Sequence, residues 1–83
     1  MFINIDKAIQ QLRETLPPVI ARNKIAYYLG GLVSVGYMQN LDSEGKGPKR
    51  IRIGRRCGYL REDLLEWLSV KMKEEPNERR PKE

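Results

Sequence analysis

A proline pair, Pro17-Pro18, closes the first part of this chain and limits the length of any helix ahead of it. Proline has no backbone N–H to donate and disfavours helical geometry in the residue before it. The residues ahead of the pair carry aliphatic side chains at helical spacing, namely Ile5, Ile9, Leu12 and Leu16. Residues 1–18 are therefore predicted to form an amphipathic helix of about ten residues, capped by Asn4 or Asp6, and a stop at the prolines.

Two short helices are predicted next, because glycine interrupts the apolar pattern. The first spans Asn23 to Leu29 and ends at Gly30-Gly31. Ser34 is a good N-cap for the second, which reaches about Ser43. Helices joined by a tight turn that contains glycine are typical of the helix-turn-helix, whose second helix enters the major groove of DNA, although the pattern alone is weak.

A change of period in the second half of the chain predicts a β-hairpin. Ile51 and Ile53 alternate with arginines, so the two arms should cover about residues 49–53 and 56–60. Gly54 lies between the arms and can supply the positive φ that a tight connection needs.

The chain is predicted to finish with one more helix and a tail. The helix runs from Arg61 to about Met72 and carries a stripe of leucines with Trp67 beside it. Residues 74–83 contain no apolar residue to bury, so they are predicted to be a disordered charged tail.

The positive charge is concentrated in the middle of the chain. The 83 residues include 16 Lys and Arg against 11 Asp and Glu, and residues 22–61 hold nine of these bases but only two acids. Between Glu44 and Glu62 no acid interrupts a series of seven cations: Lys46, Lys49, Arg50, Arg52, Arg55, Arg56 and Arg61. This density indicates a surface that binds a polyanion, because each phosphate that is neutralised releases counterions. A solvated basic loop is the alternative interpretation.

The composition excludes several classes of function. The chain has no histidine and one cysteine, Cys57, so it cannot form an intrachain disulfide or a Cys/His metal cluster. We expect no metal and no cofactor, and we expect Cys57 to be a small buried strand residue. No apolar run approaches the roughly 20 residues of a membrane span, so we expect a cytoplasmic protein without a membrane partner. A chain this small offers no deep cleft, and we expect it not to be an enzyme.

The residues that carry a family resemblance lie between Ile25 and Leu68. They are Gly30-Gly31-Leu32-Val33-Ser34, Asn40 to Pro48, Ile53-Gly54-Arg55-Arg56, Tyr59 and Asp63-Leu64-Leu65-Glu66-Trp67-Leu68. Their order resembles that of the excisionase and AlpA-like winged helix-turn-helix proteins, which are similar to truncated MerR-type DNA-binding domains. The resemblance implies an α+β, mostly helical fold. It would be a small winged helix-turn-helix over residues 19–73, with a two-stranded β-hairpin as its wing and an additional N-terminal helix.

The resemblance also implies which side chains of the second helix face DNA. They are Ser34, Val35, Gly36, Tyr37, Gln39 and Asn40. Gln39 and Asn40 are the best candidates for reading bases, because a carboxamide can pair with N6 and N7 of adenine in the major groove. A merely solvated polar face explains either residue equally well when it is taken singly. For Tyr37, packing at the edge of the core is slightly favoured over a phosphate contact.

The predicted wing supplies the cations of the site. Arg55 and Arg56 lie at its tip, where they would reach a minor groove or the phosphates beside it. Further positive charge for phosphates would come from Lys46, Lys49, Arg50 and Arg52. The alternative is that these cations serve only solubility.

The function implied by the resemblance is sequence-specific binding of double-stranded DNA by a small protein of a mobile element of the prophage type. It would act as an excisionase, also called a recombination directionality factor, or as an AlpA-type transcriptional regulator, and the sequence does not separate the two. An integrase or recombinase and further copies on DNA are the other partners implied. The alternative is an interaction adaptor or antitoxin-like protein whose N-terminal helix docks on a second chain. That alternative requires the aliphatic stripe of the helix to remain exposed.

Overall fold

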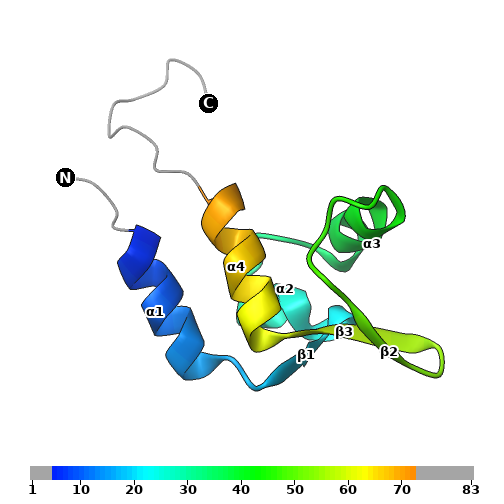
Figure 1. Cartoon of the computed structure of the whole chain (residues 1–83), viewed down its shortest axis with the longest axis horizontal. Helices are drawn as coiled ribbons and strands as arrows, with labels where there is room; N and C mark the ends of the chain where they lie inside the picture. The colour runs from blue at the N-terminus through cyan, green and yellow to red at the C-terminus, as the bar shows by residue number, and fades with distance from the viewer. Residues whose placement is uncertain (1–4, 73–83) are drawn as a thin grey trace, which may run out of the picture.

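The computed structural model describes residues 5–72 (Figure 1). Their elements are α1 (Ile5–Thr15), β1 (Val19–Ala21), a 3₁₀ turn η1 (Arg22–Lys24), α2 (Ile25–Tyr28), α3 (Val35–Ser43), β2 (Ile51–Ile53), β3 (Arg56–Leu60) and α4 (Arg61–Lys71). This is a small α+β domain, as predicted. The predicted tail, residues 74–83, lies outside the described residues. None of the helices described is long and apolar enough to cross a membrane.

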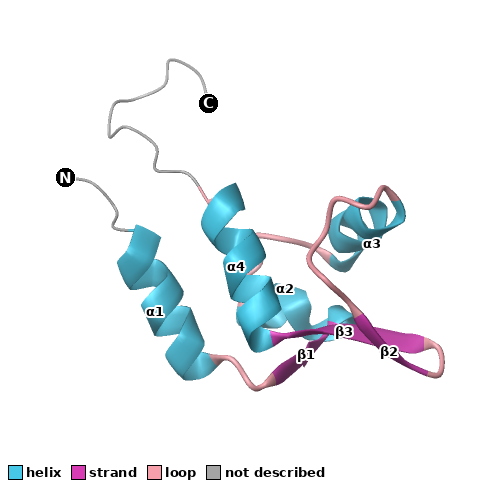
Figure 2. Ribbon diagram, in the orientation of Figure 1, coloured by secondary structure: helices cyan, strands magenta, loops and turns pink. Residues whose placement is uncertain are grey.

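The three strands form one antiparallel sheet in the order β1-β3-β2 (Figure 2). The hairpin of β2 and β3 was predicted, but β1, the third strand of the sheet, was not. Strand β1 has three residues, too few for an alternating pattern to show, and it follows the extended backbone that the prolines impose. Ile20 of β1 lies opposite Tyr59 of β3, and both are fully buried.

Gly58 allows β1 to lie this close to β3. A Cβ atom added to Gly58 would lie 2.6 Å from the carbonyl oxygen of Ile20 and 3.2 Å from Cα of Ala21. Both of these contacts are with backbone, which cannot move away as a flexible side chain can. A larger residue at this position would therefore separate the two strands.

The N-terminal helix packs on the domain rather than standing apart from it. Helix α1 lies beside α4 (Figure 1), and Ile9 and Leu16 are 8% and 3% exposed within the common core. Ile5 and Leu12 are partly buried against the same cluster. The aliphatic stripe is thus used internally, and it is not the free docking surface that an adaptor would need. Asn4 lies outside the described residues, and Asp6 belongs to the first turn of the helix.

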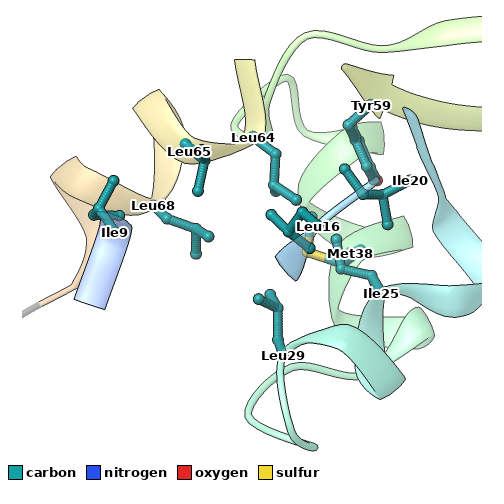
Figure 3. Packing of buried hydrophobic residues seen from close by; sticks show 10 residues of the cluster. All are labelled: Ile9, Leu16, Ile20, Ile25, Leu29, Met38, Tyr59, Leu64, Leu65 and Leu68. Atoms are coloured by element: carbon teal, nitrogen blue, oxygen red, sulfur yellow. The ribbon is translucent and has the colours of Figure 1, made fainter. Parts of the chain in front are cut away.

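The hydrophobic core contains residues from α1, α2, α3 and α4 and from the strands β1 and β3 (Figure 3). Its buried members are Ile9, Leu16, Ile20, Ile25, Leu29, Met38, Tyr59, Leu64, Leu65 and Leu68. Helix α4 contributes three of them and ends at Lys71, close to the predicted end. Trp67 is only partly buried and packs at the edge of this cluster.

The helix predicted from Asn23 to Leu29 begins differently from the prediction. Its first turn is the 3₁₀ turn η1, and α2 follows with four residues. Ala21 precedes η1 and has no side-chain oxygen to cap an N–H group, which leaves the first turn without the usual stabilisation. Residues 29–34 then connect α2 to α3, with Gly30 and Gly31 at φ of 65° and 84°.

Leu64→Ala tests the core. Leu64 is fully buried, so we expect the substitution to lower the free energy of unfolding by about 2–5 kcal/mol. Val70→Ala on the same helix is the matched control, since Val70 is 74% exposed and should cost little. Thermal melting followed by circular dichroism measures both. Equal losses in the two variants would contradict this description of the core.

Candidate nucleic-acid interface

Helix α3 presents a polar outer face and a buried inner face. Ser34 caps the helix, because its hydroxyl oxygen accepts a hydrogen bond of 3.0 Å from the backbone N–H of Tyr37. Met38 is fully buried on the inner face, while Gln39 and Asn40 are exposed as predicted. Gly36 is also exposed and has open space where a Cβ would lie. A large partner could therefore approach the backbone of this face closely.

Tyr37 lines a hydrophobic groove to which neither Gln39 nor Asn40 contributes. Tyr37 is 47% exposed, and the volume of the groove is about 760 Å³. The groove lies between α1, α4 and the connection from α2 to α3, and its apolar lining includes Leu12, Leu32, Val33, Trp67, Leu68 and Met72. Tyr37 is not among the residues packed against the core, so the packing role favoured for it stays a prediction.

The hairpin carries its cations in the open. All six side chains of the predicted wing set are exposed: Lys46, Lys49, Arg50, Arg52, Arg55 and Arg56. Lys46 lies 3.8 Å from the carboxylate of Glu44. Within residues 5–72 the other five form no ion pair, so their charge is available to a partner.

The turn of the hairpin places one apolar side chain among these cations. Gly54 has a φ of 61°, and Ile53 pairs with Arg56 across the turn. Ile53 is 81% exposed, because it lies on the sheet face opposite to the buried Tyr59. Side chains alternate between the two faces of the sheet along β2. Arg52 lies on the same face as the buried Cys57, and the isoleucines of β2 lie on the opposite face.

Part of α3 and the hairpin tip converge on a hollow of about 180 Å³. Val35 and Gln39 line it from α3, and Arg55 and Arg56 line it from the hairpin. The remaining lining residues are Ala21, Arg22, Asn23 and Cys57. Four of the predicted site residues thus lie around one depression, whereas Ser34, Gly36, Tyr37, Asn40, Lys46, Lys49, Arg50 and Arg52 lie outside its lining.

The sequence analysis missed Arg22 and Asn23 as site residues. Arg22 counted only toward the charge of the middle segment, and Asn23 served only as the start of a helix. Both residues lie at the beginning of the first helix of the predicted pair, and this position is the signal that could have identified them. Their closeness to the hairpin tip could not be predicted, because it depends on the pairing of β1 with β3.

A buried carboxylate connects the helix, the sheet and η1. Asp42 is 6% exposed on the inner face of α3, and its Oδ2 accepts hydrogen bonds from the hydroxyl of Tyr59 at 2.7 Å and from Nη1 of Arg22 at 2.9 Å. Burial and the bond to Asp42 raise the pKa of Tyr59 above its usual value of 10.0. Asp42 also raises the pKa of Arg22, which remains charged. The sequence analysis did not predict the burial of Asp42; its position four residues after Met38, on the same face of the helix, is the signal that could have found it.

The segment between α3 and β2 is tied to both α3 and α4. The backbone N–H of Lys46 donates to the carbonyl oxygen of Leu41 at 2.8 Å, and Nε1 of Trp67 donates to the carbonyl oxygen of Lys46 at 2.9 Å. Gly47 lies against Asp42, and an added Cβ would overlap with Oδ1 of that residue. The helix and the hairpin are therefore held in a defined relative position.

Comparisons with known proteins gave no match to a family model, to a curated protein or to a solved structure. In the part of the chain that the structure describes, no group of three or more His, Cys, Asp or Glu side chains could hold a metal ion.

Tyr59→Phe tests the buried carboxylate. It removes one of the two hydrogen bonds to Asp42 while the ring remains in the core, so we expect a loss of about 1.5–3 kcal/mol in the free energy of unfolding. Tyr27→Phe is the control, since Tyr27 is 79% exposed. Chemical denaturation at neutral pH measures the difference, and equal stabilities of the two variants would be the contrary result.

The stabilities of the wild type and Tyr59→Phe should converge in alkaline solution. A folded-state pKa raised above 10.0 means that Tyr59 ionises more readily in the unfolded chain, so its contribution to stability is present below pH 10 and is lost as the pH rises further. We therefore expect the stability advantage of the wild type over Tyr59→Phe to shrink above about pH 10. Denaturation from pH 7 to pH 11 measures this advantage, and the same value across the range would contradict the assignment.

Proposed function

We propose that this protein binds double-stranded DNA sequence-specifically, with α3 in the major groove and the β2–β3 hairpin on the adjacent backbone and minor groove. The observation that carries the proposal is the placement of five exposed cations without ion pairs in residues 5–72, namely Lys49, Arg50, Arg52, Arg55 and Arg56, on a hairpin beside the polar face of α3. Unpaired cations attract phosphate strongly, because no protein carboxylate has to be displaced first.

The two elements supply different kinds of contact. Gln39 and Asn40 can hydrogen-bond to base edges, which distinguishes one base pair from another in the major groove. Arg55 and Arg56 at the hairpin tip can contact phosphates or enter a narrow minor groove, where charge and shape matter more than base identity. The succession of α2, a turn with two glycines, α3 and the hairpin along the chain supports the finer proposal of a winged helix-turn-helix.

The family resemblance narrows the proposal to a mobile-element protein. The protein would be an excisionase, which assists an integrase by binding and bending DNA as several copies, or an AlpA-type regulator of transcription. Both activities would use the same DNA-contacting residues. The adaptor alternative loses support from the position of α1, whose aliphatic stripe packs into the core.

Binding should weaken steeply with salt. Each phosphate that is neutralised contributes about 0.9 units to the slope of log affinity against log salt concentration. Fluorescence anisotropy with duplex DNA at several salt concentrations measures the slope, and a duplex with random sequence is sufficient for the test. Undetectable binding at low salt, or binding that does not respond to salt, would remove the basis of the proposal.

Helix and hairpin variants should fail in different ways. Arg55→Ala with Arg56→Ala should weaken binding to every duplex and reduce the salt slope by about one to two units. Gln39→Ala or Asn40→Ala should cost about 1–3 kcal/mol on the preferred site and leave non-specific binding nearly unchanged. The site is obtained by selection from a random library with the wild type. Competition between this site and a scrambled duplex then separates the two effects.

Two substitutions away from the proposed interface serve as controls. Lys71→Ala removes a cation from the end of α4, and Gln11→Ala removes a carboxamide from α1. Neither should change the specificity ratio. If the helix variants lower both affinities equally while the hairpin variants affect only the preferred site, the roles of the two elements are reversed.

A further inference from the structure

We infer that the hollow between α3 and the hairpin tip is a subsite for one phosphodiester group of the DNA backbone. The inference rests on the proposed function and adds the position of a single phosphate to it. It also assigns a role to Arg22 and Asn23 of η1, which belong to neither of the two predicted DNA-binding elements.

The position of the hollow follows from the geometry of B-form DNA. The major and minor grooves of a duplex are separated by one sugar-phosphate strand. If α3 occupies the major groove and the hairpin tip occupies the minor groove, that strand must pass between them. The hollow has Val35 and Gln39 on one wall and Arg55 and Arg56 on the other, so it lies where the strand would pass.

The chemistry of the lining suits a phosphate. Its charged residues are three arginines, Arg22, Arg55 and Arg56, and Asn23 and Gln39 add amide groups that can donate hydrogen bonds. None of the lining residues is acidic. The volume of about 180 Å³ is below the roughly 300–1,000 Å³ of pockets for drug-sized ligands, so a small anionic group fits better than a base or a nucleotide.

Arg22 is held in a fixed orientation at this place. Its Nη1 donates to Asp42 at 2.9 Å, and its side chain remains 23% exposed. The other N–H groups of a guanidinium can still serve a second anion. Because Arg22 also holds the buried Asp42, its removal would disturb the fold, and the test uses Asn23 instead. Asn23 is exposed within η1, directly ahead of α2, where an acidic residue is well tolerated.

Single phosphates are tested by making them neutral. In a duplex selected by the wild type, each phosphate in turn is replaced by an uncharged methylphosphonate, and the dissociation constant is measured at constant salt. We expect one position, between the major-groove and minor-groove contacts, at which neutralisation weakens binding by roughly tenfold or more.

Asn23→Asp should reduce this effect. The new carboxylate repels the phosphate in the hollow, so the variant should bind the natural duplex at least tenfold more weakly than the wild type. At the same position, a methylphosphonate should weaken the binding of the variant by a smaller factor than that of the wild type, because the new carboxylate already cancels part of the attraction of the three arginines. Gln11→Glu on α1 is the matched control, since it makes the same change of charge far from the hollow, and it should respond as the wild type does.

The outcomes separate the two proposals. If the wild type does not bind duplex DNA at low salt, the proposed function fails and the inference fails with it. If DNA is bound but Asn23→Asp responds to every methylphosphonate as Gln11→Glu does, DNA binding stands and the phosphate subsite is wrong. If inorganic phosphate alone binds and Asn23→Asp abolishes this binding, while no methylphosphonate matters, the hollow serves free phosphate and the inference is overturned. Thermal melting confirms that both variants are folded.

Discussion

The arrangement of the helix and the hairpin depends on the buried carboxylate of Asp42. A charged group that is 6% exposed is tolerated only when it is paired, and here one oxygen atom accepts bonds from both Tyr59 and Arg22. Asp42 belongs to α3, and its two partners belong to β3 and η1, so a single carboxylate connects three elements. Hydrogen bonds of 2.7 and 2.9 Å to a buried carboxylate add directional constraints to the apolar packing of these elements.

The elements with their own local signals could be predicted from the sequence. The proline pair and the aliphatic spacing located α1, Ser34 located the start of α3, and Gly54 located the turn of the hairpin. The end of α4 also agreed to within one residue with the prediction at Met72. Each of these features depends on residues that are close together in the chain, which is why periodicity and capping rules were sufficient.

The parts that could not be predicted depend on distant residues. Strand β1 exists because Ile20 and Ala21 pair with Tyr59 and Gly58, which lie far along the chain. The hollow depends in turn on this pairing, since it brings the residues after β1 to the hairpin tip. The exposure of the wing cations was predictable from their charge, but the absence of ion pairs in residues 5–72 for five of them required the positions of the acids in space.

The sheet has an open edge at β2, and the wing cations flank it. An exposed edge strand presents unpaired N–H and C=O groups, and β2 carries two isoleucines, of which Ile53 is 81% exposed. Such a strand is a template for pairing with the same strand of another molecule. Arg50, Arg52 and Arg55 lie within or directly beside this short strand, where like charges on two approaching edges repel each other. The cations that we propose to bind DNA therefore also oppose pairing between the edges of two molecules, and replacing the arginines of the hairpin would remove this protection.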